Sequence, residues 1–193
     1  MSEEDHHDCV VAIGASAGGI EAVVALLSQL PEGLNAPVVV AIHSQAGSQL
    51  KEILDHTFNL DVRTLRDGDT VEKGVIYVVP GATHAFFRDG RVRLSEPVRD
   101  SGFRPSIDGL FMTLAAEYGE RAIAVVLSGT MNDGMRGAQI VHDMGGRTIV
   151  QNPEDARFES MPMYVILADH PRKILSAGDL GLWLADTLGP HAG

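Results

Sequence analysis

Ser16 stands in a run of small residues, Gly-Ala-Ser-Ala-Gly-Gly at positions 14–19, directly after the apolar segment 9–13. Such a turn between a buried strand and a helix presents a serine hydroxyl at the N-terminus of the helix. A hydroxyl in that place can act as a nucleophile, and the amide groups around it can instead bind a phosphate. It can also simply cap the helix, with the small residues required by the tight turn.

The spacing of the glycines argues against a nucleotide-binding loop. The glycines of the turn are Gly14, Gly18 and Gly19, which does not match the Gly-x-Gly-x-x-Gly fingerprint, and the lysine of a phosphate-binding P-loop is missing. A nucleophile and a helix cap are therefore the interpretations that the turn itself favours.

The rest of the chain alternates apolar, strand-like segments with segments of helical periodicity. Strands are predicted at 9–14, 37–43, 61–65, 75–79, 122–128, 147–151 and 173–175, and helices at 18–30, 47–58, 106–118, 134–144, 161–168 and 179–188. Strands with little polar alternation, separated by helices, are typical of an α/β fold with a doubly wound, mostly parallel sheet and helices on both faces. The segment 86–94, with Asp89-Gly90 as its turn, predicts a β-hairpin at one edge of the sheet.

Three residues that could form a hydrolytic triad are expected at one rim of this sheet. Ser16 follows the first strand, His43 ends the second, and Asp133 follows the strand at 122–128. Parallel strands share a direction, and ligands of open α/β sheets bind beyond the carboxyl ends of the strands. A serine, a histidine and an aspartate at that rim have the chemistry of a nucleophile, a base and an orienting acid. The alternatives are a satisfied polar residue at a strand end for His43 and a helix cap for Asp133.

Composition bounds the function further. The 193 residues carry a net charge of −11, which argues against nucleic acid as a partner, because phosphate binding needs clustered Lys and Arg. Cys9 is the single cysteine, so no intrachain disulfide is expected and a reducing, cytoplasmic location is the simplest interpretation. No signal peptide or membrane-inserting segment is recognisable. We expect one domain over 9–188, a disordered acidic leader over 1–8 and a flexible tail over 189–193, with no metal site and no cofactor.

Six motifs in order along most of the chain resemble the catalytic domain of chemotaxis protein-glutamate methylesterases (CheB-type). They occupy residues 13–19, 40–43, 76–84, 104–111, 126–134 and 150–162. The resemblance implies a sheet of about seven mainly parallel strands. It also implies a serine hydrolase that removes methyl groups from glutamate γ-methyl esters of chemoreceptors, and such enzymes can also deamidate receptor glutamines.

The resemblance also implies a role for individual residues. Ser16 matches the family's nucleophile, His43 its base and Asp133 its orienting acid. The backbone N–H groups of Ala17 and Thr130 match the oxyanion positions. Three residues are possible substrate contacts: Arg104 and Met161 from the resemblance alone, and His84, which follows the strand at 75–79 and could alternatively serve as base or structural residue.

The chain departs from the family pattern at three places. Ser44-Gln45 stands where Met-Pro often follows the histidine, and Ser128-Gly129-Thr130-Met131 stands in place of Thr-Gly-Met-Gly. The family's receiver domain is expected to be absent, because only eight polar residues precede the first strand, so this looks like a standalone form. The loss of a glycine at 131 supports an alternative function, a catalytically impaired binding module that engages a receptor, a kinase or another partner of a sensory pathway.

Overall fold

Strands and helices alternate from Val10 to Leu188 in the computed structural model, which describes residues 9–44, 49–95, 105–168 and 170–190. The elements, in chain order, are β1 (Val10–Ala15), α1 (Gly19–Leu27), β2 (Val38–Ile42), α2 (Leu50–Thr57), β3 (Asp61–Thr64), β4 (Val75–Val78), β5 (His84–Arg88), β6 (Arg91–Ser95), α3 (Ile107–Tyr118), the 3-10 helix Gly119–Arg121, β7 (Ala122–Val126), α4 (Met135–Asp143), β8 (Arg147–Gln151), α5 (Ser160–Ala168), β9 (Lys173–Leu175) and α6 (Ala177–Leu188). The predicted elements are confirmed with shifted ends, and only the 3-10 helix was not expected.

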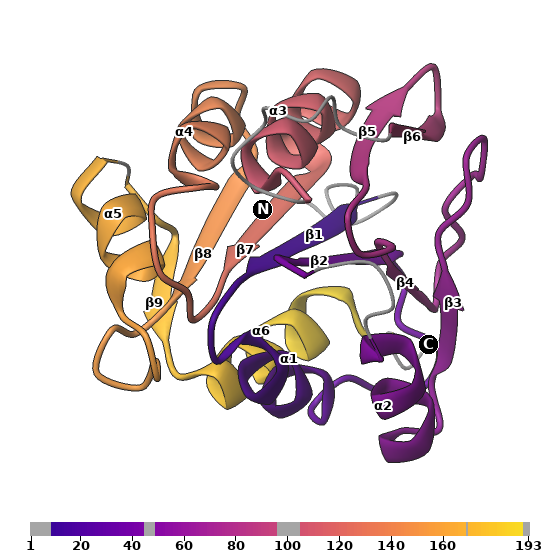
Figure 1. Ribbon diagram of the computed structural model, residues 1–193, viewed down its shortest axis with the longest axis horizontal. Coiled ribbons are helices and arrows are strands. Elements are labelled where there is room, and N and C mark those ends of the chain that lie inside the picture. Colours follow the sequence, from indigo (N-terminus) through magenta and orange to yellow (C-terminus); the bar gives the residue numbers. More distant parts are fainter. Residues whose placement is uncertain (1–8, 45–48, 96–104, 169, 191–193) are drawn as a thin grey trace.

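Seven strands form one sheet in the order β3-β4-β2-β1-β7-β8-β9, and every pairing in it is parallel. The first strand, β1, therefore lies at the centre, with β2 on one side and β7 on the other (Figure 1). The chain winds outward from β1 in both directions, which confirms the doubly wound parallel sheet. The loops after β1, β2 and β7 consequently lie side by side at the carboxyl ends of the strands.

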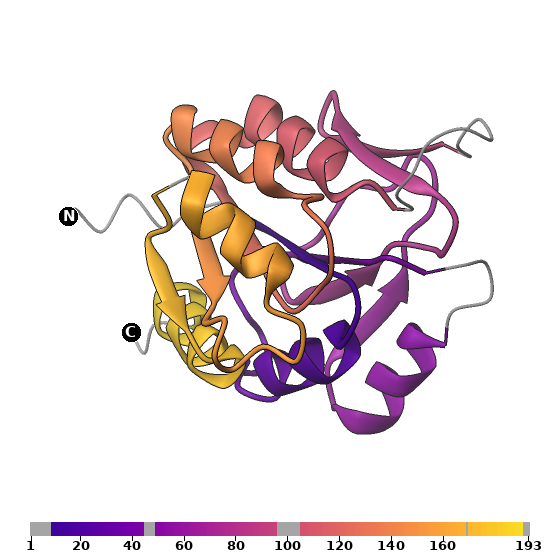
Figure 2. The ribbon, with the colours of Figure 1, turned by 60° about the vertical axis from the view of Figure 1, so that its left-hand side comes forward.

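Helices cover both faces of the sheet, as Figures 1 and 2 show. Because side chains alternate along a strand, Val11 and Ile13 of β1 enter one core, which α1, α2 and α6 complete. Val10 and Ala12 point the other way, into a core completed by α3, α4 and α5. All six residues of β1 are buried, as expected for a strand covered on both faces.

The predicted hairpin is confirmed as β5 and β6, which pair in antiparallel fashion around the turn at Asp89 and Gly90. Both turn residues have positive φ, 53° and 70°, as a tight hairpin turn requires. The hairpin forms a two-stranded sheet of its own and packs on α3 instead of continuing the main sheet. The Phe87 N–H, for example, donates to Thr113 Oγ1 of α3 at 3.1 Å.

Helices of the described residues are too short to span a bilayer. The longest, α3 and α6, have 12 residues each, whereas a transmembrane helix needs about 20 apolar residues.

The close approach of α3 to the central strand gives a testable prediction. A Cβ added to Gly14 would collide with the side chain of Ile107 and lie 3.1 Å from Phe111, both in α3. Gly14→Ala is therefore expected to lower the free energy of unfolding by about 1–3 kcal/mol, the usual range for overpacking a core. Urea denaturation of Gly178→Ala is the matched control, because an added Cβ at Gly178 meets no atom within 4 Å. Equal stability of the two variants would contradict the prediction.

Candidate active site

The turn after β1 holds Ser16 against the end of β7. The Ser16 N–H donates to the carbonyl of Ser128 at 2.9 Å, and the Ser16 carbonyl accepts from the N–H of Gly19, where α1 begins. Gly18 closes the turn with φ 69°, a left-handed conformation that glycine adopts without strain. The hydroxyl of Ser16 thus lies at the N-terminus of α1, whose partial positive charge favours a developing anion.

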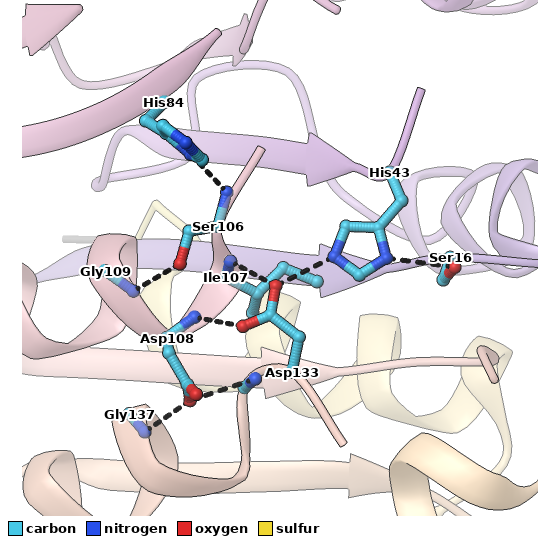
Figure 3. A network of polar contacts seen from close by, with 10 residues as sticks. Ser16, His43, His84, Ser106, Ile107, Asp108, Gly109, Asp133 and Gly137 are labelled. Atoms are coloured by element: carbon cyan, nitrogen blue, oxygen red, sulfur yellow. Dashed lines mark hydrogen bonds and ion pairs between the residues drawn. The ribbon is translucent and has the colours of Figure 1, made fainter. Parts of the chain in front are cut away.

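His43 bridges Ser16 and Asp133, as Figure 3 shows. Its Nδ1 lies 3.1 Å from Ser16 Oγ, and its Nε2 lies 2.8 Å from Asp133 Oδ2. The side chain of His43 is 14% exposed and that of Asp133 only 3%, so the network is largely shielded from water. The three residues that the sequence placed on one rim are therefore in hydrogen-bonding contact.

The orientation of the His43 ring follows from its two partners. The Asp133 carboxylate only accepts hydrogen bonds, so the Nε2–H donates to it, and Nδ1 is left to accept from the Ser16 hydroxyl. In serine proteases of the chymotrypsin type the two ring nitrogens have the opposite roles. The order of contacts from serine to histidine to acid is nevertheless the same.

Asp133 receives two further hydrogen bonds from the first residues of α3. The N–H of Ile107 donates to Oδ2 at 2.7 Å, and the N–H of Asp108 donates to Oδ1 at 2.8 Å. These N–H groups have no partner within their own helix, so a carboxylate at this place satisfies them. Both bonds fix the position of the Asp133 carboxylate against the start of α3.

Asp108 makes the reciprocal contact with α4. Its Oδ1 accepts from the N–H groups of Gly134 and Gly137, at 3.0 and 2.8 Å. Burial raises the pKa of Asp108 above the ordinary value of 3.8, the backbone N–H groups oppose this shift, and the charge of Asp133 adds to it. The sequence analysis did not single out Asp108, because its partners are separated from it by 26 and 29 residues.

His84, the first residue of β5, contacts the start of α3. Its Nδ1 accepts from the N–H of Ser106 at 2.8 Å, and Ser106 in turn caps α3, with its hydroxyl accepting from Gly109 N–H at 3.1 Å. His84 is 8% exposed and its ring contacts Phe86. The predicted N-cap at Ser106 is confirmed, whereas a substrate-binding role of His84 stays a prediction.

A buried serine joins the Ser16 turn to the loop after β7. Ser128 Oγ donates to the carbonyl of Ala17 at 2.8 Å and accepts from Phe158 N–H at 3.0 Å. The Ser128 N–H donates to Oε1 of Gln151, which is 3% exposed. The sequence analysis gave Ser128 and Gln151 no role. The signal available was a glutamine directly after the apolar pair Ile149-Val150 of a predicted strand, since a buried amide needs partners.

The proposed oxyanion donors, Ala17 and Thr130, come from these two joined segments. Over the described ranges of the chain, neither backbone N–H donates a hydrogen bond, so both are available to a ligand. Gly129, which precedes Thr130, allows the two segments to approach each other closely, because a Cβ there would lie 2.9 Å from Ser16 Cβ and collide with Met161. Their role toward an oxyanion stays a prediction.

Of the other two predicted substrate contacts, Met161 is described by the structure and Arg104 is not. Met161 is 1% exposed and lies against Gly129, with its N–H donating to the Gly129 carbonyl at 3.0 Å. Arg104, Gln45, the acidic leader over 1–8 and the tail residues 191–193 lie outside the described residues. Substrate contacts by Arg104 and Met161 stay predictions.

A cleft of about 160 Å³ opens beside Ser16 and His43. Its other walls come from the start of α1, the end of β2 and the start of α2: Gly18, Gly19, Ile20, Glu21, Ile42, Ser44 and Leu50. Pockets for whole small molecules usually measure about 300–1,000 Å³. The cleft therefore fits the end of one side chain. Among the described residues, no group of three or more His, Cys, Asp or Glu side chains is arranged to hold a metal ion.

Comparison with known proteins identifies the family of this site. The family model of CheB methylesterase matches residues 11–184. The chain belongs to the CheB methylesterase family. The crystal structure of the Thermotoga maritima CheB methylesterase catalytic domain superposes with a TM-score of 0.88 and 30% sequence identity, covering 94% of this chain and 99% of that one.

Two curated relatives extend the comparison to longer proteins of the CheB family. One, a protein-glutamate methylesterase/protein-glutamine glutaminase of Myxococcus xanthus, is 33% identical over 174 residues, which are 89% of this chain and 49% of the relative. Another with this name, from Anaeromyxobacter dehalogenans, is 38% identical over 145 residues, which are 74% of this chain and 42% of the relative. The chain spans about half the length of these relatives, or less.

Met131 occupies the loop position at which the CheB pattern led us to expect a glycine. Met131 has φ 77°, so it adopts the left-handed conformation that glycine reaches without strain. Met131 is 53% exposed, so the bulk of the methionine is accommodated at the surface. The substitution therefore costs strain, and it leaves the path of the loop beside Ser16 compatible with a CheB-type site.

This strain can be measured. A non-glycine residue in the left-handed region costs about 1–2 kcal/mol, and part of the gain from glycine is offset by its freedom in the unfolded chain. Met131→Gly is expected to raise the free energy of unfolding by about 0.5–1 kcal/mol in urea denaturation. Met131→Val, whose β-branched side chain tolerates positive φ less well, is expected to lower it. A loss of stability in Met131→Gly would contradict this account of the loop.

Proposed function

We propose that this protein is a serine hydrolase that converts glutamate γ-methyl esters of chemoreceptor-like proteins to glutamate and methanol. The observation that carries the proposal is the contact of His43 with Ser16 on one side and Asp133 on the other. Membership of the CheB methylesterase family supports the choice of substrate.

Acylation uses the triad in the order of its contacts. His43 Nδ1 takes the hydroxyl proton of Ser16 as Oγ attacks the ester carbonyl, and Asp133 stabilises the imidazolium that forms. The tetrahedral intermediate carries a negative oxygen, which the N–H groups of Ala17 and Thr130 and the dipole of α1 would stabilise. Collapse breaks the C–O bond to the methoxy group, which leaves as methanol with the proton from Nδ1.

Deacylation repeats these steps with water as the nucleophile. His43 takes a proton from water as the water oxygen attacks the acyl-enzyme, and this proton goes to Ser16 Oγ as the C–O bond to Ser16 breaks. The γ-carboxylic acid that is released gives up its proton to solvent. An amide can enter the same sequence when Nδ1–H protonates the departing nitrogen. On this basis we include deamidation of glutamine, which the names of the relatives also contain.

The surroundings of the cleft support a protein substrate. The cleft holds one side-chain end, and two exposed apolar residues lie near it: Ile20, which lines it and is 38% exposed, and Phe158, also 38% exposed. Phe158 lies against Gly18 of the Ser16 turn. Apolar side chains around a narrow cleft suit a macromolecule that covers them while it inserts one side chain.

We also assign the protein to the cytoplasm. Cys9, the single cysteine of the chain, is a buried free thiol, which is compatible with a reducing compartment. The partner in this proposal is a methylated receptor or a similar signalling protein, and the net charge of −11 argues against a nucleic acid.

Replacement of the nucleophile tests the reaction. Ser16→Ala is expected to lower methanol release from a methylated receptor fragment by about 10³-fold or more, because no hydroxyl remains to form the acyl-enzyme. The variant should melt like the wild type, since the Ser16 hydroxyl supports no element of the fold. Ser28→Ala removes a serine hydroxyl at the other end of α1, where it donates to the Ala25 carbonyl, and should keep wild-type methanol release. Normal turnover by Ser16→Ala would sink the proposed mechanism.

The role of His43 separates an enzyme from a binding module. A fluorophosphonate probe should label Ser16 in the wild type and react at least about 10²-fold more slowly in His43→Gln, which lacks the base. His56→Gln is the matched control, because His56 is exposed on α2 and, among the described residues, bonds to the Glu52 carbonyl of its own helix. Mass spectrometry locates the label. Absence of labelling in the wild type, with a folded protein, would favour the catalytically impaired module.

A further inference from the structure

We propose that Asp108 is a positioning residue that holds the acid of the triad in place by capping the helix behind it. The inference rests on the serine-hydrolase function proposed above, and it extends that function to a residue on a different helix. Asp108 acts through Asp133, and the bonds that carry its effect are those to the N-terminus of α4.

The two aspartates cap each other's helices. Asp133 stands directly before α4, yet its carboxylate accepts from the first two N–H groups of α3. Asp108 is the second residue of α3, yet its carboxylate accepts from Gly134 and Gly137 at the start of α4. Figure 3 shows Asp108 between Asp133 and Gly137. Two N–H groups at the start of each helix are thus satisfied across the interface: those of Ile107 and Asp108 for α3, and those of Gly134 and Gly137 for α4.

Close packing makes this exchange rigid. A Cβ at Gly137 would lie 2.6 Å from Phe111 Cβ and 3.1 Å from Asp108 Cα, so the two helices approach too closely for any side chain there. Asp133 is 4% exposed and Ile107 is fully buried. Because the groups between α3 and α4 are buried and closely packed, a shift of α4 relative to α3 must change the hydrogen bonds of Asp108 and Asp133.

The backbone passes the effect of Asp108 to the triad. Gly134, one of the two donors to Asp108, is the residue next to Asp133. Loss of the Asp108 carboxylate leaves the Gly134 and Gly137 N–H groups without this acceptor and frees the first turn of α4 to move. The Asp133 backbone then moves with it, and the 2.8 Å contact with His43 Nε2 loses its geometry.

The role of Asp108 is geometric, because both of its bonds to α4 go to the same oxygen, Oδ1. An asparagine offers one carbonyl oxygen at the same distance from the backbone and can make both bonds without a charge. Asparagine at 108 should therefore hold α4, whereas alanine should not. The opposite holds for Asp133, where the charge itself is needed opposite the imidazolium.

Fluorophosphonate labelling of Ser16 tests the inference, with kinact and KI measured separately. Asp108→Ala is expected to lower kinact by about 10- to 100-fold, the range for misplacing a catalytic group by about an ångström, with KI within about 2-fold of wild type. Asp108→Asn is expected to recover most of that loss. Gly137→Ala, which removes no polar atom but separates α3 from α4, is expected to lower kinact as well.

Ser176→Ala is the matched control. Ser176 caps α6 by accepting from Asp179 N–H at 3.1 Å, so this variant loses a helix cap outside the triad and should keep wild-type kinact. Wild-type kinact in folded Asp108→Ala would overturn the inference. If Asp108→Ala does not fold, a slow but folded Asp108→Asn would also overturn it, because charge and not geometry would then be the requirement. An unlabelled wild type would instead contradict the proposed function and leave these variants without a reaction to compare.

Discussion

The carboxylate of Asp133 is the contact on which the site and much of its surroundings depend. One group orients His43 and satisfies two N–H donors at the start of α3. Without these donors, a polar group whose side chain is only 3% exposed would be costly to bury. Without the carboxylate, α3 would begin with unsatisfied amides next to the central strand. The same carboxylate therefore serves both the fold, by capping α3, and the triad, by orienting His43.

Ser16 has a comparable support in the loop after β7. Ser128 accepts the Ser16 N–H through its carbonyl and donates to Ala17 through its hydroxyl, while Gln151 fixes the Ser128 N–H. Gln151 donates in turn to Asp155, whose carboxylate accepts from Ala177 at the start of α6. The turn with Ser16 is thus tied through these bonds to the start of α6. A site built in this way needs little rearrangement when charge develops in it, which is the condition for strong electrostatic stabilisation.

The sheet and the rim of the site were predictable because parallel strands share a direction. Ser16 and His43 directly follow buried strands, so strand order alone brings them near each other. Asp133 is harder, because it lies seven residues beyond the end of β7 and its orientation depends on α3, a distant segment. The reciprocal bonds of Asp108 and Asp133 and the bonds of Ser128 to Ala17 and Gln151 join residues 23 to 111 positions apart, and no local pattern encodes such pairs. The positive φ of Met131 could not be predicted from propensity either, since a methionine ordinarily avoids the left-handed conformation.

The size of the cleft has a consequence for what distinguishes one substrate from another. About 160 Å³ beside the triad accommodates an ester group and little of the molecule that bears it. For the proposed substrates, the chemistry inside the cleft is then nearly the same for every methylated glutamate. Discrimination between them would arise from how far a side chain projects from its parent surface and from whether that surface can approach Ile20 and Phe158. The shape of the surface around the methyl ester would then decide which substrate is used.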